Sequence, residues 1–201
     1  MKNRLVIVGA SGHGKVVADI AQLNGYTDIV FLDDNKSVTE CAGYPVIGNT
    51  NAIIDGDIFV AIGNSIIRQE LMNRFIDHCQ PILIHPNAIV AKDVKIGAGS
   101  VVMAGAVINP STTIGRGCII NTSSSVDHDC VLGDFVHIAV GAHICGTVTI
   151  SDSVWVGAGA IISNNISIGS DCVIGAGGIV VKDLLKPGIY VGIPAKKIKE
   201  S

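Results

Sequence analysis

A short polar stretch in an otherwise apolar half of the chain places His128 between two carboxylates, Asp127 and Asp129. Imidazole is the side chain best suited to accept a proton near neutral pH. Either neighbouring carboxylate could hold the ring in one tautomer and raise its basicity, and the spacing alone leaves both open. The three residues therefore predict a general base, with a solvated polar edge as the alternative.

A six-residue period sets the elements that position His128. Seventeen consecutive positions spaced by six, from Ile84 to Val180, are all Ile, Val or Leu. A helix repeats every 3.6 residues and a half-buried strand every two, so the period indicates a parallel β-helix whose coil takes three units, or 18 residues. Gly, Asn or Asp often follows the aliphatic residue, and these types accept the positive φ that we expect at corners. They stand at positions 97, 109, 115, 121, 127, 133, 157, 169 and 175.

The 18-residue coil predicts which residues lie side by side. Gly146 follows His128 by one coil, so we expect it one strand spacing, about 4.8 Å, from the histidine. Its backbone N–H could support a developing oxyanion beside the base. His137 lies half a coil from His128, so the two histidines could work together only across a subunit interface. Three such prisms can pack around a threefold axis, and we expect a homotrimer.

The chain before residue 84 is expected to form an α/β domain with a glycine-rich turn, Gly9-Ala-Ser-Gly-His-Gly14. Such a turn between a strand and a helix is typical of phosphate sites at helix N-termini. An NTPase P-loop is disfavoured because Val16 occupies the position of the Ser or Thr that would ligate Mg²⁺. A tight turn without a ligand is the other alternative. We expect strands at 4–9, 28–32 and 57–63, helices at 15–24 and 65–79, and a loop around 43–45.

The length of this domain and its acidic residues favour a nucleotide or nucleotide sugar over a dinucleotide. About 80 residues suffice for one mononucleotide-binding half. The phosphates are expected near Ser11, Gly12 and His13, although His13 could equally be a solvent-facing turn residue. Asp33 and Asp34, at the end of the second strand, could bind a ribose or base.

Composition excludes several classes of protein. The net charge is -3 with 15% charged residues and no basic cluster before residue 196, which gives no nucleic-acid footprint. Polar residues interrupt every apolar run before it could span a bilayer, so we expect a cytoplasmic protein without membrane insertion. Cys118, Cys130 and Cys172 share a slot that otherwise takes small residues, which predicts small buried side chains. We expect no metal, because the histidine spacings do not resemble those of a trimeric zinc hydratase.

Together the motifs resemble the left-handed β-helix (hexapeptide-repeat) acyltransferases, and among them the NeuD/PglD-type sugar acetyltransferases. The resemblance implies a Rossmann-like α/β domain at 1–83, a left-handed parallel β-helix of hexapeptide repeats at 84–186 and a C-terminal cap at 187–201. The motifs that carry it are the glycine turn, Phe31-Leu-Asp-Asp34, Ala61-Ile-Gly-Asn64, Asn121-Thr-Ser-Ser, Asp127-His128-Asp129 and Val191-Gly-Ile-Pro-Ala-Lys196.

The resemblance also implies an activity, closest to that of the PglD-like members. These are homotrimers that acetylate the 4-amino group of a UDP-4-amino-4,6-dideoxy sugar from acetyl-CoA, in bacillosamine-type pathways. O-acetylation of a sialic acid or another sugar is the alternative, and a non-catalytic trimer that binds nucleotide sugars is a second. One departure is that the acids beside the histidine are Asp where PglD-like proteins typically have Glu.

Residue roles follow from the same resemblance. His128 would deprotonate the acceptor amine, Asp129 would enhance its basicity, and the amide of Gly146 would support the tetrahedral intermediate. The implied acetyl-CoA groove is lined by His137, Gly146, Ala158 and Ala176. The residues implied to hold the UDP part are Ser11, Gly12, His13, Asp33, Asp34 and Gly63.

Overall fold

A computed structural model describes residues 2–199, and the chain divides into two units, Met1–Pro86 and Asn87–Ser201. The sequence placed this boundary at residue 83. The elements of the first unit are β1 (Lys2–Val8), α1 (Gly12–Leu23), β2 (Tyr26–Leu32), β3 (Glu40–Cys41), β4 (Tyr44–Gly48), β5 (Asp57–Val60), α2 (Ser65–Arg74) and β6 (Leu83–Ile84).

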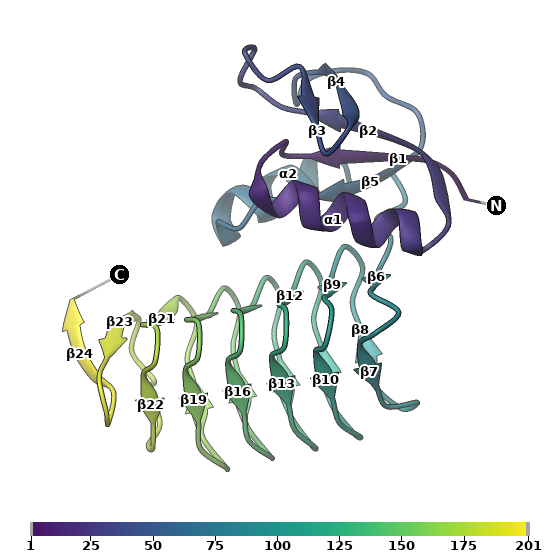
Figure 1. The fold of residues 1–201 in the computed structure, drawn as a ribbon. Coiled ribbons are helices and arrows are strands. Elements are labelled where there is room, and N and C mark those ends of the chain that lie inside the picture. The colour runs from purple at the N-terminus through teal and green to yellow at the C-terminus, as the bar shows by residue number, and fades with distance from the viewer. Residues whose placement is uncertain (1, 200–201) are drawn as a thin grey trace. The chain divides into compact units, whose positions relative to one another are not determined.

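The first unit is built on a sheet whose strand order is β3-β4-β2-β1-β5 (Figure 1). The parallel strands β1, β2 and β5 lie at its centre, where Leu5, Phe31 and Phe59 are buried. Central parallel strands are covered on both faces, which explains their nearly continuous apolar sequences. The helix α1 packs against β1 and β2, and α2 packs against β5. The carboxyl ends of the three central strands therefore gather the turns that follow them at one edge.

The segment around residue 44, expected as a loop, instead forms β3 and β4. The strand β4 pairs in parallel with β2, Val46 lying opposite Phe31, and β3 pairs with β4 in antiparallel fashion. Proline lacks a backbone N–H, so it is tolerated in strands only near a sheet edge. Pro45 lies in β4 near the edge of this sheet, and reading it as a loop signal was wrong.

The second unit is a β-helix in which every strand from β7 to β22 ends on one aliphatic residue of the six-residue period. Each strand pairs in parallel with the strand three places later, and Ser125 and Val126 lie beside His143 and Ile144. The predicted fold class and its 18-residue coil are confirmed. The strands are β7 (Ile89–Val90), β8 (Lys95–Ile96), β9 (Val101–Val102), β10 (Val107–Ile108), β11 (Thr113–Ile114), β12 (Ile119–Ile120), β13 (Ser125–Val126), β14 (Val131–Leu132), β15 (His137–Ile138), β16 (His143–Ile144), β17 (Thr149–Ile150), β18 (Trp155–Val156), β19 (Ile161–Ile162), β20 (Ser167–Ile168), β21 (Cys172–Ile174) and β22 (Ile179–Val180).

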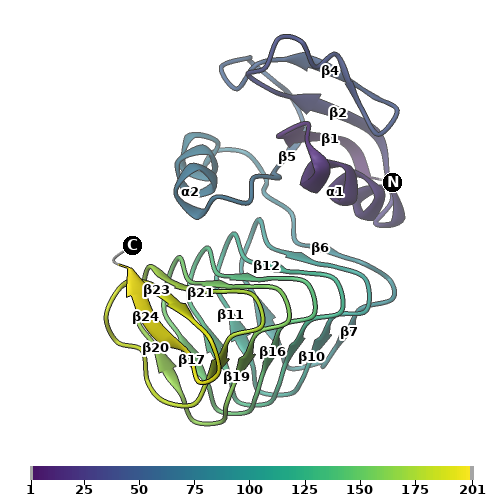
Figure 2. The ribbon, with the colours of Figure 1, turned by 60° about the vertical axis from the view of Figure 1, so that its left-hand side comes forward.

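These strands stack into flat sheets along the prism (Figure 2). One has the order β22-β19-β16-β13-β10-β7, another β20-β17-β14-β11-β8, and a third runs through β24-β23-β21-β18-β15-β12-β9. We call them the β13 face, the β14 face and the β15 face. After the repeat, β23 (Gly188–Val191) pairs with β21 and β24 (Lys196–Lys199) pairs with β23, so the tail extends the β15 face.

The corners of the coil differ from the sequence expectation. Positive φ occurs three positions after the aliphatic residue, as at Asp129 (57°) and Phe135 (58°), and not at the position directly after it. The glycines that follow the aliphatic residues meet a different demand, since a Cβ at Gly157 would lie 2.6 Å from the carbonyl oxygen of Ile174 in the next coil. Close stacking of coils, and not backbone handedness, therefore selects glycine there.

The interior of the prism is apolar, as the period requires. The aliphatic residues from Val102 to Val180 are all buried, and so are the small residues of the neighbouring slot, including Cys118, Cys130 and Cys172. The prediction that these cysteines act as small buried side chains is confirmed. Burial raises the pKa of the Cys130 and Cys172 thiols, which keeps both protonated. Within residues 2–199, no helix has the length and apolar character needed to cross a bilayer.

Candidate active site

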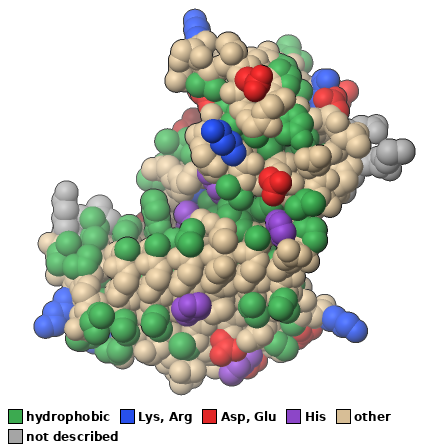
Figure 3. Space-filling view, viewed as in Figure 1, with side chains coloured by type: hydrophobic (Ala, Val, Ile, Leu, Met, Phe, Trp, Pro, Cys, Tyr) green, Lys and Arg blue, Asp and Glu red, His purple; other side chains and the backbone are tan. Residues whose placement is uncertain are grey.

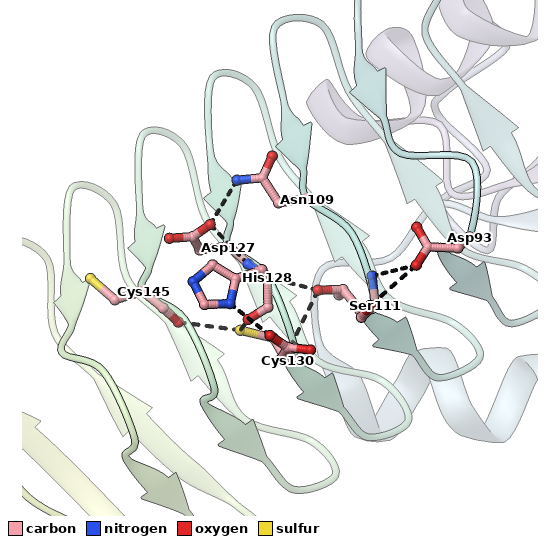
Figure 4. Close-up of polar contacts among 9 residues, drawn as sticks. Asp93, Asn109, Ser111, Asp127, His128, Cys130 and Cys145 are labelled. Atoms are coloured by element: carbon pink, nitrogen blue, oxygen red, sulfur yellow. Dashed lines mark hydrogen bonds and ion pairs between the residues drawn. The ribbon is translucent and has the colours of Figure 1, made fainter.

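His128 stands at the corner between β13 and β14, with its side chain 53% exposed. Its Nδ1 atom lies 2.8 Å from Oδ2 of Asp129 (Figure 4). A carboxylate only accepts hydrogen bonds, so this contact places the proton on Nδ1 and leaves the lone pair on Nε2. Asp129, and not Asp127, therefore orients the ring.

Asp127 holds the backbone beneath the ring. Its Oδ1 accepts hydrogen bonds from the backbone N–H of His128 at 2.8 Å and from Nδ2 of Asn109 at 2.7 Å. These two bonds, the one from Asn109 first, hold the pKa of the Asp127 carboxyl below its usual range. Asp127 thus remains an anion whose position is fixed from two directions.

The two carboxylates make His128 a stronger base. The hydrogen bond from Asp129 is the main cause that raises the pKa of His128, and the charge of Asp127 adds to it. Both stabilise the imidazolium form that appears once the ring has taken a proton. An exposed imidazole with a fixed tautomer and a raised pKa is suited to general-base catalysis near neutral pH.

Gly146 lies against the imidazole, as the coil period predicts. A Cβ at Gly146 would come within 2.7 Å of both Cε1 and Nε2 of His128. Among the residues that the structure describes, no acceptor is found for the backbone N–H of Gly146. The lone pair of a base and an amide donor thus lie side by side, an arrangement that suits proton removal next to a developing oxyanion.

His137 occupies a different face of the same prism. It projects from β15, where its ring stacks on that of Trp155 with centroids 5.1 Å apart and an angle of 18° between the planes. Nδ2 of Asn121 lies 3.2 Å from Nε2 of His137, while Oδ1 of Asn121 accepts the N–H of Thr122. Because that second bond identifies the amide oxygen, the amide nitrogen faces His137 and Nε2 is its acceptor. The proton of a neutral His137 therefore resides on Nδ1.

Ala158 and Ala176 lie on the corner between the β15 face and the β13 face. Both are exposed, and the N–H of Gly177 donates to the carbonyl oxygen of Ala158, so the two alanines occupy the same corner in consecutive coils. Within one chain, the structure brings His137, Ala158 and Ala176 to one face and its corner, while His128, Asp129 and Gly146 occupy the next corner. The two groups of residues implied by the resemblance do not meet in a single prism.

In the first unit, the residues implied for the nucleotide lie at the carboxyl ends of β1, β2 and β5. Ser11 caps α1, and the N–H of Ala10 donates to Oδ2 of Asp33 at 2.8 Å, which joins the glycine turn to the end of β2. A Cβ at Gly14 would collide with the carbonyl oxygen of Gly9, so only glycine allows this close turn. An open pocket of about 320 Å³ lies beside Asp33, lined also by Lys36 and Gly48.

Asp34 and Gly63 have structural partners at the same edge. Both carboxylate oxygens of Asp34 lie within hydrogen-bond distance of the Thr50 hydroxyl, and one also accepts the Thr50 N–H. The carbonyl oxygen of Gly63 accepts a hydrogen bond from the buried guanidinium of Arg68. Asp33 is thus the acid of the pair that borders the open pocket.

His13 is mostly buried, contrary to a solvent-facing turn residue. Burial and then the charge of Arg68 lower its pKa to about 4. Its Nε2 atom is buried and has no hydrogen-bond partner among the described residues. At neutral pH His13 is therefore uncharged, and it could meet a ligand as a hydrogen-bonding group but not as a cation.

Sequence reasoning missed Asn109 and Trp155. Asn109 precedes Asp127 by 18 residues and Trp155 follows His137 by 18, so the coil period that located Gly146 could have located both. Within the described part of the chain, no group of three or more His, Cys, Asp or Glu is arranged to hold a metal ion.

Comparison with known proteins gives consistent matches. Residues 4–75 match the PglD N-terminal domain family. Over 119 residues the chain is 34% identical to a UDP-N-acetylbacillosamine N-acetyltransferase of Bacillus subtilis (strain 168), a match that covers 52% of this chain and 52% of that protein. The match thus spans about half the length of this curated relative.

Solved structures match over nearly the whole chain. The acetyltransferase domain of PglB from Neisseria gonorrhoeae FA1090 has a TM-score of 0.94 and 41% identity, and the match covers 97% of this chain and 99% of that one. The same domain in complex with acetyl coenzyme A matches at 0.94 and 40%, over 98% and 100%. PerB from Caulobacter crescentus, in complex with CoA and GDP-perosamine, matches at 0.90 and 35%, over 96% of each chain.

Proposed function

Because the chain belongs to the PglD-type family of left-handed β-helix sugar acetyltransferases, we propose that it transfers acetyl from acetyl-CoA to the 4-amino group of a UDP-4-amino-4,6-dideoxy sugar. The observation that carries the proposal is the corner of the β-helix where Asp129 fixes the proton of His128 on Nδ1 and Gly146 lies against Nε2. The relative from Bacillus subtilis, named for a UDP sugar, supports UDP as the nucleotide.

The geometry supports direct transfer without a covalent enzyme intermediate. The amine nitrogen attacks the thioester carbonyl while Nε2 of His128 takes a proton from that nitrogen, and Asp129 stabilises the imidazolium. The N–H of Gly146 donates to the oxyanion that forms on the carbonyl oxygen. The C–S bond then breaks, the thiolate of CoA leaves, and the imidazolium can return the proton to sulfur. The amide product and CoA account for every atom.

Acetyl-CoA is proposed to lie between subunits, because one prism separates His128 from His137, Ala158 and Ala176. The outward side chains of the β13 face support a homotrimer, since Ile89, Val107, Ile161 and Ile179 alternate there only with Ser125 and His143. Figure 3 shows this face, on which hydrophobic side chains lie around a histidine. The β14 face instead presents Lys95, Thr113, Thr149 and Ser167 with Val131, as a solvated surface would.

The first unit is proposed to hold the UDP part at the carboxyl ends of its strands. Backbone N–H groups at the start of α1, near Ser11 and Gly12, suit the phosphates. Asp33, beside the open pocket, suits a ribose or base, and the uncharged His13 would contribute a hydrogen bond. Both substrates are cytoplasmic metabolites, and we place the reaction in the cytoplasm.

Release of free CoA tests the proposal. The purified protein is incubated with acetyl-CoA and a panel of UDP-4-amino sugars, GDP-4-amino sugars and sialic acid, and the acetylated product is identified by mass. We expect turnover with a UDP-4-amino sugar and a loss of about 10²- to 10⁴-fold in His128→Ala. The matched control is Thr113→Ala, an exposed change on the β14 face. Turnover with sialic acid alone would establish O-acetylation, and silence across the panel would leave a binding protein.

A further inference from the structure

Asn109 makes a side-chain hydrogen bond that runs along the axis of the β-helix. It follows β10 as Asp127 follows β13, and the two strands pair with Val107 beside Ser125 and Ile108 beside Val126. The backbone N–H of Asn109 donates to the carbonyl oxygen of Val126 at 2.9 Å, and its Nδ2 donates to Oδ1 of Asp127 at 2.7 Å. Main chain and side chain thus bind the next coil at the same rung (Figure 4).

A second residue of the same coil holds Asp127 from below. The hydroxyl of Thr112, which is buried, donates to the carbonyl oxygen of Asp127 at 2.8 Å. The preceding coil therefore holds Asp127 at both its carbonyl group and its carboxylate. Without these bonds, a carboxylate at an exposed corner would sample several rotamers.

The held carboxylate acts on His128 in turn. The Oδ1 atom that accepts from Asn109 also accepts the backbone N–H of His128 at 2.8 Å. This chain of contacts fixes the residue from which the imidazole projects, while Asp129 fixes only the rotation of the ring. The two aspartates therefore have separate tasks, and Asn109 serves the first of them.

We propose that Asn109 is a positioning residue for acetyl transfer, holding Asp127 so that the backbone of His128 and the negative charge beside it stay in place. The catalytic meaning of this role rests on the proposed function. The contacts themselves can be tested without any substrate.

The expected effect on His128 has a clear sign. The Asn109 bond is the main cause that lowers the pKa of Asp127, and the charge of Asp127 is among the causes that raise the pKa of His128. Once Asn109 is removed, the carboxylate can turn toward solvent, and the pKa of His128 should fall. The other titratable groups of this corner are Asp129 on the same turn, Asp93, which binds Ser111 in a preceding coil, and the thiols of Cys130 and Cys145.

Histidine NMR on the full-length protein measures this fall directly. The signal of His128 is assigned by its absence in His128→Asn, and it is titrated in wild type, Asn109→Ala, Asp127→Asn and the double variant. We expect Asn109→Ala to lower the pKa of His128 by about 0.3 to 0.5 units. Because Asn109 acts through Asp127, the double variant should titrate like Asp127→Asn alone. An unchanged titration in Asn109→Ala, or full additivity in the double variant, would overturn the proposal.

The kinetic arm separates this proposal from the proposed function. With the accepted sugar, the acid limb of the kcat/KM profile should move to lower pH in Asn109→Ala, with about a two- to fivefold lower plateau and an unchanged KM for acetyl-CoA. Thr113→Ala, on the neighbouring β11, should change neither. If no panel sugar reacts, the proposed function fails while the NMR result still decides the role of Asn109. Asn109→Ser, which is smaller but polar, replaces the alanine variant if the latter melts early, and the same NMR criteria then apply to it.

Discussion

The Nδ1 atom of His128 lies 2.8 Å from Oδ2 of the residue that follows it, Asp129, whose backbone has a φ of 57°. Neighbouring side chains in an extended chain point to opposite sides. The left-handed turn at Asp129 brings its short carboxylate back to the ring, and aspartate is among the few residues that adopt this conformation readily. The shorter acid in place of glutamate is therefore compatible with the orienting role.

Asp129→Asn should reduce acetyl transfer strongly while leaving the fold intact. An amide that donates to Nδ1 would move the ring proton to Nε2, which removes the lone pair that receives the proton of the amine. We expect kcat to fall about 10²- to 10⁴-fold, with the melting temperature nearly unchanged because both side chains are more than half exposed. Steady-state kinetics measures the loss. A tenfold smaller effect in Asp129→Asn than in Asp127→Asn would contradict the assignment of the orienting acid.

Gly146→Ala should act on the ring and not on the coil. Gly146 is not among the residues with positive φ, but the added Cβ would press within 2.7 Å of the imidazole. The exposed ring can turn away, at the cost of its alignment. We expect kcat to fall about tenfold or more, since a displacement of about 1 Å has costs of this order. A crystal structure of the variant shows whether the ring has moved, and an unmoved ring with normal turnover would exclude a contact role for Gly146.

Mixed subunits test whether the active site lies between chains. His128→Ala and His137→Ala remove groups from different faces of the prism, so each pure variant should be impaired. If the site joins two subunits, unfolding and refolding the two variants together should restore activity in a fraction of the mixed trimers. Turnover of the mixture is compared with the average of the separate variants. Equality of the two values would place the whole site within one chain.

Trp155 offers an optical signal for the acetyl-CoA groove. It is the only tryptophan of the chain, it stacks on His137, and its side chain is 44% exposed. Addition of CoA should therefore change its fluorescence, and Trp155→Leu should raise the KM for acetyl-CoA about three- to tenfold, as expected for the loss of one ring stack. Fluorescence that stays constant while CoA binds by calorimetry would place the cofactor away from this face.

His13 should make the first unit sensitive to acid. Its pKa in the folded chain is about 4, below the ordinary value of 6.5, so between these values only the unfolded chain takes up the proton. The stability contribution is fully present above pH 6.5 and is lost as the pH falls toward 4, amounting to about 2 kcal/mol at pH 5. Urea unfolding at pH 7.5 and pH 5 should show a smaller difference in His13→Gln than in wild type. Equal differences would mean that His13 is accessible to solvent.

The fold could be predicted from sequence because the coil repeats its environment. Every aliphatic residue from Val102 onward faces the same dry interior, and the period of six passes directly into strand positions. The corners were harder, because Gly, Asn and Asp follow the aliphatic residue for reasons other than backbone handedness. Gly157 is small because the next coil touches it, whereas Asp127 uses its side chain to bind neighbours. Residue type alone does not separate these causes.

The candidate site could be predicted only in part. The period placed Gly146 beside His128 and separated His128 from His137, since both relations depend on counting residues. The choice between Asp127 and Asp129 depends on one rotamer and one left-handed turn, which the pattern of residues does not contain. The burial of His13 depends on packing around Arg68, a residue far away in sequence. Such contacts become visible only in three dimensions.

The 18-residue coil also determines which insertions and deletions the protein can tolerate. A deletion of six residues between His128 and Gly146 would leave every later aliphatic residue facing inward, so the prism would still close. It would nevertheless turn the rest of the chain by one face, and a residue other than Gly146 would arrive beside the imidazole. A deletion of 18 residues elsewhere in the coil would instead preserve both the interior and the alignment of corners. Changes of length by sixes are therefore compatible with folding, but only whole coils are compatible with chemistry.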